Sequence, residues 1–160
     1  MVYSVAFRFV RNTHDAEDIT QEVFVRLWKN LSKYNPQQAR FSTWLYRIAS
    51  NCCLDFLRSA PRRNDRSMFS LDSIVDVAAA STPEQEMNDL ELNDIVTSAA
   101  NELAPKQRLV FILRDLEGLS PEEVAAALNM SLGNVKSNLC HARQKVAAKL
   151  KVHFNVTDNP

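Results

Sequence analysis

The stretch from Leu119 to Leu150, LSPEEVAAALNMSLGNVKSNLCHARQKVAAKL, decides the fold, because it reads as two helices joined by a tight turn. The first helix begins with Ser120 as an N-cap hydroxyl, Pro121 at the first helical position and Glu123 able to close a capping box. Asn129 stands at the turn, and asparagine tolerates a positive φ better than most residues. The pattern predicts a helix-turn-helix, whose second helix enters the major groove of DNA.

Both predicted helices have an apolar side and a polar side. Val124, Ala125 and Leu128 form the predicted inner face of the first helix. The second helix, which Ser131 can cap, has the predicted inward residues Leu132, Val135, Leu139, Ala142 and Val146. The opposite side offers Lys136, Ser137, Cys140, His141 and Gln144 for base edges, and Arg143, Lys145 and Lys149 for phosphates. An ordinary solvated face is the alternative for one such helix alone, but the cap, the turn and the following basic helix together favour DNA binding.

The composition indicates an all-helical protein. The 160 residues suffice for one ordinary domain or two small ones, and only 2 are glycine, which argues against a β-rich fold with many tight turns. The chain has no run of eighteen apolar residues and no signal-peptide pattern, so we expect no direct membrane insertion.

The reactive side chains do not predict a metal site, a cofactor or an enzyme. Cys52, Cys53 and Cys140 lack paired metal-ligand spacing, so we expect reduced thiols in a cytoplasmic protein. The three histidines are too scattered to propose zinc binding. The chain also contains no P-loop, no zinc-protease motif and no nucleophile–base arrangement.

The net charge of zero hides a segregation of charge along the chain. Residues 1–66 carry 11 Lys/Arg and 6 Asp/Glu, residues 67–104 carry 8 Asp/Glu and no Lys/Arg, and residues 105–160 carry 8 and 5. Two basic modules therefore flank an acidic connector. Basic modules favour a polyanionic partner through counterion release.

The first module, residues 1–63, has three predicted helices: Val2 to Val10, Thr13 to about Leu31, and Phe41 to Ser59. A polar loop with an Asn35-Pro36 turn signal precedes the third. The broad apolar side predicted for the second helix comprises Ala16, Ile19, Val23, Phe24, Leu27, Trp28 and Leu31. The residues that the third helix is expected to bury are Leu45, Ile48, Ala49, Cys52 and Phe56.

The second module, residues 82–152, is predicted to hold four helices. One runs from Thr82 to about Glu102, the next from Pro105 to about Asp115, and the helix-turn-helix completes the module. Residues 64–81 are a predicted linker and 153–160 a frayed tail. The predicted fold is all-α, with two helical bundle domains joined by a flexible acidic linker.

Three motifs resemble bacterial RNA polymerase sigma factors of the extracytoplasmic-function (ECF) group. They are DAEDITQEVFVRLWKN (15–30), FSTWLYRIASNCCLDFLR (41–58) and LAPKQRLVFILRDLEGLSPEEVAAALNMSLGNVKSNLCHAR (103–143). The first module is similar to sigma region 2 and the second to sigma region 4. The resemblance implies a cytoplasmic factor that directs core RNA polymerase to specific promoters and assists DNA melting. The implied partners are the β′ and β subunits of the polymerase, promoter DNA and an anti-sigma factor.

The resemblance also implies a polymerase-binding surface, made of Asp15, Asp18, Gln21 and Glu22. This surface would dock on the coiled coil of the β′ subunit, since ordered carboxylates on a rigid helix suit a basic partner helix. The alternative is an exposed acidic face that closes i,i+4 ion pairs, such as Glu22 with Arg26.

Two promoter-binding surfaces follow from the same resemblance. The one for the −10 element comprises Tyr34, Asn35, Arg40, Trp44, Arg47, Asn51 and Arg58. Opening DNA requires pockets for unstacked bases beside cations. Trp44 is either a stacking platform or a core residue. The surface for the −35 element comprises Lys136, Ser137, Cys140, His141 and Arg143.

The chain departs from the family pattern in three places. Asn138 stands where the family usually has arginine, which we expect to weaken a phosphate contact or alter the preferred sequence. Asn129 replaces a common glycine, which the turn accepts. Family members usually have about one more helix before the position of Val2, and we expect its absence to reduce the stability of the first module.

Two other functions fit a helix-turn-helix. A dimeric transcriptional repressor or activator would bind a palindromic operator without polymerase, with the protein's symmetry mirrored in the site. An interaction adaptor whose helix-turn-helix no longer reads DNA would keep its activity after charge reversal at Lys136 and Arg143.

Overall fold

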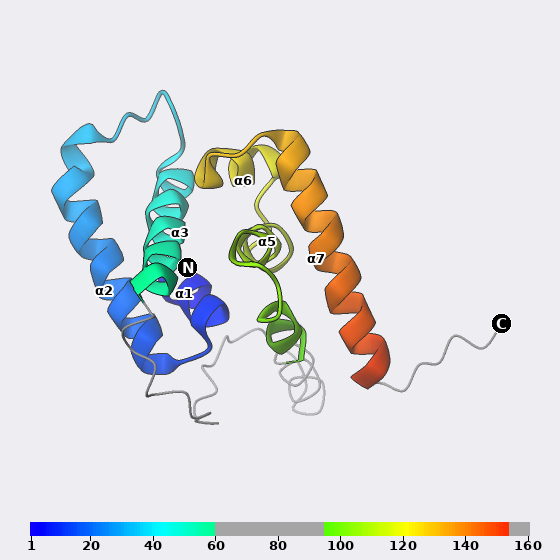
Figure 1. Ribbon diagram of the computed structural model, residues 1–160. Coiled ribbons are helices and arrows are strands. Elements are labelled where there is room, and N and C mark those ends of the chain that lie inside the picture. Colours follow the sequence, from blue (N-terminus) through cyan, green and yellow to red (C-terminus); the bar gives the residue numbers. More distant parts are fainter. Residues whose placement is uncertain (60–94, 154–160) are drawn as a thin grey trace, which may run out of the picture.

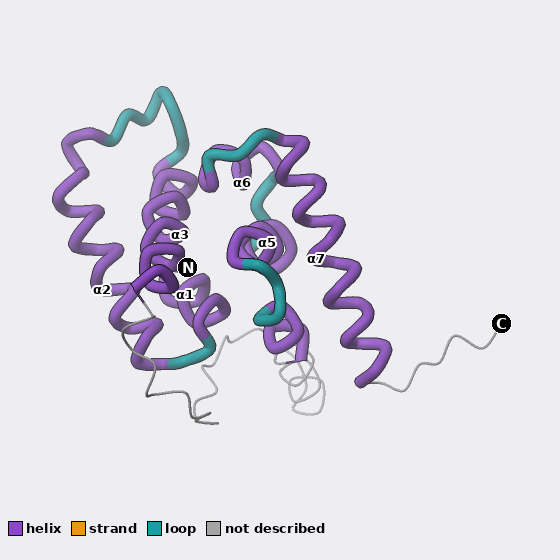
Figure 2. The backbone as a smooth tube through the Cα atoms, viewed as in Figure 1, coloured by secondary structure: helices purple, strands orange, loops and turns teal. Residues whose placement is uncertain are grey.

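The computed structural model describes residues 1–59 and 95–153, and within them it contains only helices and loops (Figures 1 and 2). The elements are α1 (Val2–Val10), α2 (Thr13–Asn30), a 3-10 turn (Leu31–Lys33), α3 (Phe41–Ser59), a helical segment over 95–100, α5 (Pro105–Phe111) with its π-helical continuation (Ile112–Leu116), α6 (Pro121–Leu128) and α7 (Leu132–His153). The predicted all-helical fold is confirmed. The linker predicted at 64–81, the helix start at Thr82 and residues 154–160 of the tail lie outside the described residues.

Helices α1, α2 and α3 pack against one another to form the first module. Arg11 ends α1 in the left-handed conformation, with a φ of 57°, and its N–H donates to the Phe7 carbonyl at 2.8 Å. Asn12 then caps α2, because its side-chain oxygen accepts from the Asp15 N–H at 2.9 Å. The shared core comprises Val5, Ala6, Phe9, Ala16, Ile19, Val23, Leu45, Ala49 and Cys53.

The predicted helix-turn-helix is formed by α6 and α7, and its local signals act as expected. The Ser120 hydroxyl accepts from the Glu123 N–H at 3.1 Å, and the Glu123 carboxylate accepts from the Ser120 N–H at 2.9 Å. Asn129 has a φ of 50° and ends α6. The Ser131 hydroxyl accepts from the Asn134 N–H at 3.2 Å at the start of α7. The capping box and the asparagine turn therefore fix the two ends of α6, and the second cap fixes the start of α7.

The apolar side predicted for α2 was too broad. Ala16, Ile19 and Val23 are buried, but Phe24, Trp28 and Leu31 are 53%, 80% and 47% exposed. These three residues are rotated around the helix away from the buried stripe, because α1 and α3 together cover only one side of α2.

Three other predicted inward faces need smaller corrections. Leu132 of α7 is exposed, and Ile48 and Phe56 of α3 are half-buried. In α6, Ala127 is more deeply buried than Ala125 or Leu128.

The two modules share one hydrophobic core. Buried residues of the first module join Leu109, Val110, Ile112, Leu113, Val124 and Val135 of the second in a single cluster. A smaller cluster lies between the 95–103 segment, α5 and α7, and comprises Ala99, Ala100, Leu103, Phe111, Ala142 and Val146. Helix α6 packs against α3, so the module that carries the helix-turn-helix rests directly on the first module (Figure 1).

Leu109→Ala tests the shared core. The Leu109 side chain is fully buried in the cluster that spans both modules, so its truncation should lower the free energy of unfolding by about 2–5 kcal/mol. Leu132→Ala is the matched control, because Leu132 is 43% exposed and should cost less than about 1 kcal/mol. Urea denaturation followed by circular dichroism measures both, and equal losses would contradict the packing.

Candidate functional site

The outward face of α2 combines carboxylates with exposed apolar side chains. Asp15 and Asp18 are half-buried, and Gln21 and Glu22 are exposed. Val25 and Trp28 follow Gln21 by four and seven residues, so they lie on the same side of the helix. The sequence reasoning missed these two apolar residues as surface groups. The unusual width of the apolar pattern on α2 was the signal that could have revealed them.

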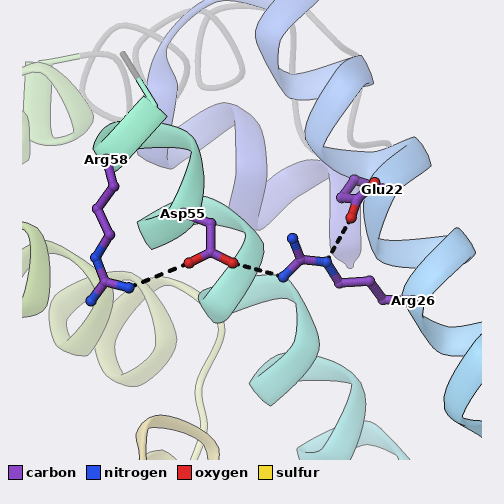
Figure 3. A network of polar contacts seen from close by, with 4 residues as sticks. All are labelled: Glu22, Arg26, Asp55 and Arg58. Atoms are coloured by element: carbon purple, nitrogen blue, oxygen red, sulfur yellow. Dashed lines mark hydrogen bonds and ion pairs between the residues drawn. The ribbon is translucent and has the colours of Figure 1, made fainter. Parts of the chain in front are cut away.

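Glu22 also belongs to a network of ion pairs between α2 and α3 (Figure 3). The Arg26 guanidinium donates to Glu22 at 2.6 Å and to Asp55 at 2.8 Å, and Asp55 also pairs with Arg58 at 3.4 Å. The bonds to Asp55 and Glu22 raise the pKa of Arg26 further above its ordinary value. The i,i+4 pair considered as an alternative is thus present, and Glu22 and Arg58 both have intramolecular partners.

Three aromatic rings gather where the 31–40 segment meets the start of α3. The Tyr34 ring lies 5.4 Å from that of Phe41 in an edge-on arrangement and 5.0 Å from that of Trp44, measured between centroids. Phe41 and Trp44 are 5.9 Å apart. Trp44 is half-buried in this cluster and is not one of the fully buried core residues. Phe41 was not predicted as a site residue, although its i,i+3 spacing from Trp44 was a usable signal.

Hydrogen bonds within residues 34–39 stabilise the loop that carries Tyr34. The Tyr34 hydroxyl donates to the Ala39 carbonyl at 3.2 Å. The Asn35 side-chain oxygen accepts from the Gln37 N–H at 2.9 Å, and the Asn35 carbonyl accepts from the Gln38 N–H at 3.1 Å. The turn predicted at Asn35-Pro36 is therefore confirmed, and the Tyr34 ring is fixed against α3.

The polar residues predicted for α3 lie along one side of that helix. Arg47 and Asn51 are exposed, and Arg58 lies farther along the same helix. Arg47 donates to the Ala126 carbonyl of α6 at 3.0 Å, and Arg40, which precedes α3, lies 3.8 Å from the Glu123 carboxylate. The structure thus places Tyr34 beside Trp44 and sets Arg47, Asn51 and Arg58 along one side of α3. The side chains of Arg40 and Arg47 contact α6.

On α7, the outward face carries Lys136, Ser137, Cys140 and His141, all of them exposed. Arg143 is also exposed, but its guanidinium donates to both oxygens of Asp115, at 2.8 and 2.6 Å. This carboxylate raises the pKa of Arg143. Sequence reasoning offered Arg143 to a phosphate, and the structure shows that such a contact would have to replace an existing bidentate ion pair.

Asn138 faces away from that outward surface. Its side-chain amide donates to the Asn134 carbonyl at 2.7 Å. The residue is half-buried and lines a groove of about 530 Å³ between the modules, together with Leu54, Leu57, Arg58, Ala104, Pro105, Lys106 and Gln107. An arginine at this position would enter a groove that already holds two cations.

The three cysteines are free thiols, as predicted. Cys52 and Cys53 are buried, and burial raises their pKa to about 11 and about 12. Cys140 is exposed on α7. Within residues 1–59 and 95–153, no three His, Cys, Asp or Glu side chains form a group that could hold a metal ion, and no helix is long and apolar enough to cross a bilayer.

Comparison with known proteins identifies the family. Residues 1–63 match Sigma-70 region 2, and residues 93–146 match Sigma-70, region 4. The ECF RNA polymerase sigma factor SigW of Bacillus subtilis is 32% identical over 161 residues, an alignment that covers 94% of this chain and 83% of that protein. The chain belongs to the ECF group of RNA polymerase sigma factors. It is therefore a transcription initiation factor of the class that directs core RNA polymerase to promoters.

Other relatives of this sigma factor agree. The ECF sigma factor SigE of Mycolicibacterium smegmatis is 38% identical over 98% of this chain, which spans 60% of that relative's length. The sigma-E factor of Escherichia coli is 33% identical over 94% of this chain and 81% of its own. The sigma factor RpoE of Bartonella quintana, solved with the anti-sigma factor NepR, has the same fold, with a TM-score of 0.72 at 24% identity over 94% of this chain and 90% of that one. CnrH, solved with the cytosolic domain of CnrY, has a TM-score of 0.65 at 24% identity, over 94% of this chain and 80% of that one.

Arg26→Gln tests the network that positions α2 on α3. Arg26 holds two carboxylates on different helices, so its loss should reduce the free energy of unfolding by about 1 kcal/mol. Arg58→Gln removes one long, exposed pair to the same Asp55 and should have no measurable effect. Thermal and urea unfolding at low ionic strength compare the two variants, and equal stability would contradict the role assigned to Arg26.

Proposed function

We propose that this sigma factor docks on core RNA polymerase through the outward face of α2, engages the −10 element with α3 and the preceding loop, and engages the −35 element with α7. One observation supports this assignment above all. The three sets of residues lie on α2, on α3 with the loop before it, and on α7, and none of their side chains belongs to the buried core that the helices share.

The polymerase-docking face joins charge to an apolar anchor. Asp15, Asp18, Gln21 and Glu22 supply the acidic and polar groups, and Trp28 is 80% exposed beside them. Exposed large apolar side chains that cluster on one face mark a binding surface, and tryptophan is over-represented among the residues that dominate binding energy. We therefore add Val25 and Trp28 to the predicted surface. The carboxylates would orient and accelerate docking on a basic helix.

The −10 surface suits single-stranded DNA. Tyr34, Phe41 and Trp44 form a compact aromatic group, and flipped bases stack on such rings. Arg40, Arg47 and Asn51 are exposed nearby and can follow the sugar-phosphate backbone. The side-chain oxygen of Asn35 already accepts a hydrogen bond from the Gln37 N–H. The side-chain nitrogen of Asn35 is therefore the donor that a base could use.

The −35 surface suits the major groove. Lys136, Ser137, Cys140 and His141 lie on the exposed side of α7, the second helix of the helix-turn-helix. Lys136 can donate to guanine and Ser137 can donate or accept, so both are candidates for direct reading of base edges. Arg143 would contact a DNA phosphate only after breaking its ion pair with Asp115.

The setting of this function follows from the family. We propose that the protein acts in the cytoplasm, has no catalytic activity of its own, and is inhibited by an anti-sigma factor. The sigma factor RpoE was solved with the anti-sigma factor NepR, and CnrH was solved with the cytosolic domain of CnrY. The exposed apolar face of α2 would be the surface for which polymerase and inhibitor compete.

Trp28→Ala tests the docking face. The truncation should weaken binding to core polymerase by at least about tenfold and lower promoter-specific run-off transcription at limiting polymerase, since anchor residues of this kind often contribute 2 kcal/mol or more. Stability should not change, because the side chain is exposed. Val152→Ala is the control, as Val152 is 77% exposed on α7. Unchanged polymerase binding by the Trp28 variant would place the docking face elsewhere.

Lys136→Gln tests the −35 surface. Loss of this cation should weaken binding of the full chain to a −35 duplex, and if it contacts phosphate the slope of log K against log salt should fall by about 1. If Lys136 reads a base instead, the loss should be confined to one sequence position. Fluorescence anisotropy at several salt concentrations measures both, and wild-type affinity and slope would remove Lys136 from the surface.

A further inference from the structure

A largely buried carboxylate lies at the junction of the two modules. Glu117 follows the π-helical turn after α5, and its side chain is only 10% exposed. It accepts hydrogen bonds from three donors of the first module: the Ser4 hydroxyl at 2.8 Å, the Arg8 guanidinium at 2.5 Å and the Tyr46 hydroxyl at 3.1 Å. A carboxylate removed from water needs such partners to offset the cost of desolvation. The first module supplies them, so the position of Glu117 is stabilised only while the two modules are in contact.

Other polar contacts reinforce this junction. Arg108 of α5 donates to the Phe9 carbonyl at 2.8 Å, and its guanidinium lies 5.2 Å from the centre of the Phe9 ring. Arg47 of α3 donates to the Ala126 carbonyl of α6, and Arg40 pairs with Glu123. The last two contacts occupy cations that we assign to the −10 surface. Helix α6 thus lies against that surface and engages two of its cations, which stay exposed to solvent.

This packing is incompatible with binding both promoter elements at once. The −10 and −35 elements lie about 25 base pairs apart, or about 85 Å along a duplex that rises about 3.4 Å per base pair. In the structure, α3 of the first module contacts α6 of the second directly. The modules must therefore separate before each can reach its own element on the same duplex.

We propose that Glu117 is the latch of a closed, self-inhibited state, in which its bonds to Ser4, Arg8 and Tyr46 hold the helix-turn-helix module over the −10 surface. The consequence for transcription rests on the function proposed above. The latch itself is a property of the free chain. When a partner binds only the open state, its apparent affinity for the chain is proportional to the fraction of chains that are open. A weaker latch raises this fraction and therefore strengthens apparent binding.

The distance between the modules in solution tests the latch directly. Helices α2 and α7 lie on opposite sides of the closed molecule (Figure 1). Exposed Cys140 on α7 accepts one spin label, and Lys29→Cys on α2 supplies the other. Cys52 and Cys53 are buried, which protects them from the reagent. Pulsed electron spin resonance on the doubly labelled full chain should give one narrow distance distribution.

Glu117→Gln should broaden that distribution and shift it to longer distances, because the amide keeps the shape but loses the charge that Arg8 neutralises. Tyr46→Phe removes only one hydroxyl donor and should give a smaller shift, which makes it the variant least prone to misfold. Glu122→Gln is the matched control, since it makes the same charge change at an exposed position on α6. Circular dichroism checks that each variant keeps its helix content.

Run-off transcription with unlabelled protein tests the consequence. At limiting core polymerase, Glu117→Gln should raise promoter-specific transcript by about three- to tenfold, in proportion to the gain in open chains, whereas Glu122→Gln should match the wild type. An unchanged distance distribution in both Glu117→Gln and Tyr46→Phe would overturn the latch. A distribution that opens with no rise in transcript would overturn self-inhibition. Absence of transcript from the wild type itself would instead refute the proposed function, and the distance data would remain valid.

Discussion

The narrow apolar stripe on each helix is the constraint on which the rest of the structure depends. A short amphipathic helix can bury only one side, so its other side is left for partners. In α2 the buried side consists of Ala16, Ile19 and Val23, and this leaves Trp28 in solvent. In α7 the buried residues Val135, Ala142 and Val146 turn Lys136 and His141 outward. The surfaces proposed for binding are therefore a direct consequence of how the core is filled.

The intramolecular partners of the outward residues add a second level of organisation. Arg143 is held by Asp115, Arg47 by the Ala126 carbonyl and Glu22 by Arg26. Each partner keeps a charged group in a defined place, and DNA or polymerase bound at the proposed surfaces would have to replace it. Such exchange reduces the net gain from any single contact, because only the difference between the old and the new partner contributes. Selective binding then requires that several exchanges occur together.

The parts of the structure that depend on neighbouring residues were predictable from the sequence. Ser120, Glu123, Asn129 and Ser131 fix both ends of α6 and the start of α7 through bonds that span four residues or fewer, and their types alone indicate this. The bounds of α1 and α3 followed from periodicity in the same way. The prediction that the whole apolar side of α2 is buried was wrong. Periodicity shows which residues share a side of a helix, but it does not show how much of that side a neighbouring helix covers.

What the sequence could not show are contacts between residues far apart in the chain. The bonds from Ser4 and Arg8 to Glu117 span more than one hundred positions, and no local pattern marks them. The same holds for the ion pair between Arg143 and Asp115 and for the groove that Asn138 lines. The family resemblance assigned candidate residues to α2, to α3 with the loop before it, and to α7, but only the packing showed which of them already have partners.

Hydroxyl-radical footprinting of promoter DNA is the most direct measurement of the central claim, that one chain serves two separate promoter elements only when polymerase holds it. Purified chain and core polymerase together should protect two segments, at the −35 and −10 elements, with the −10 region also reactive to single-strand probes. At the same low concentration, where weak binding of the free chain to DNA is not populated, the chain alone should protect neither element. Strong protection of one symmetric site by the chain without polymerase, as for a dimeric repressor, would contradict the account.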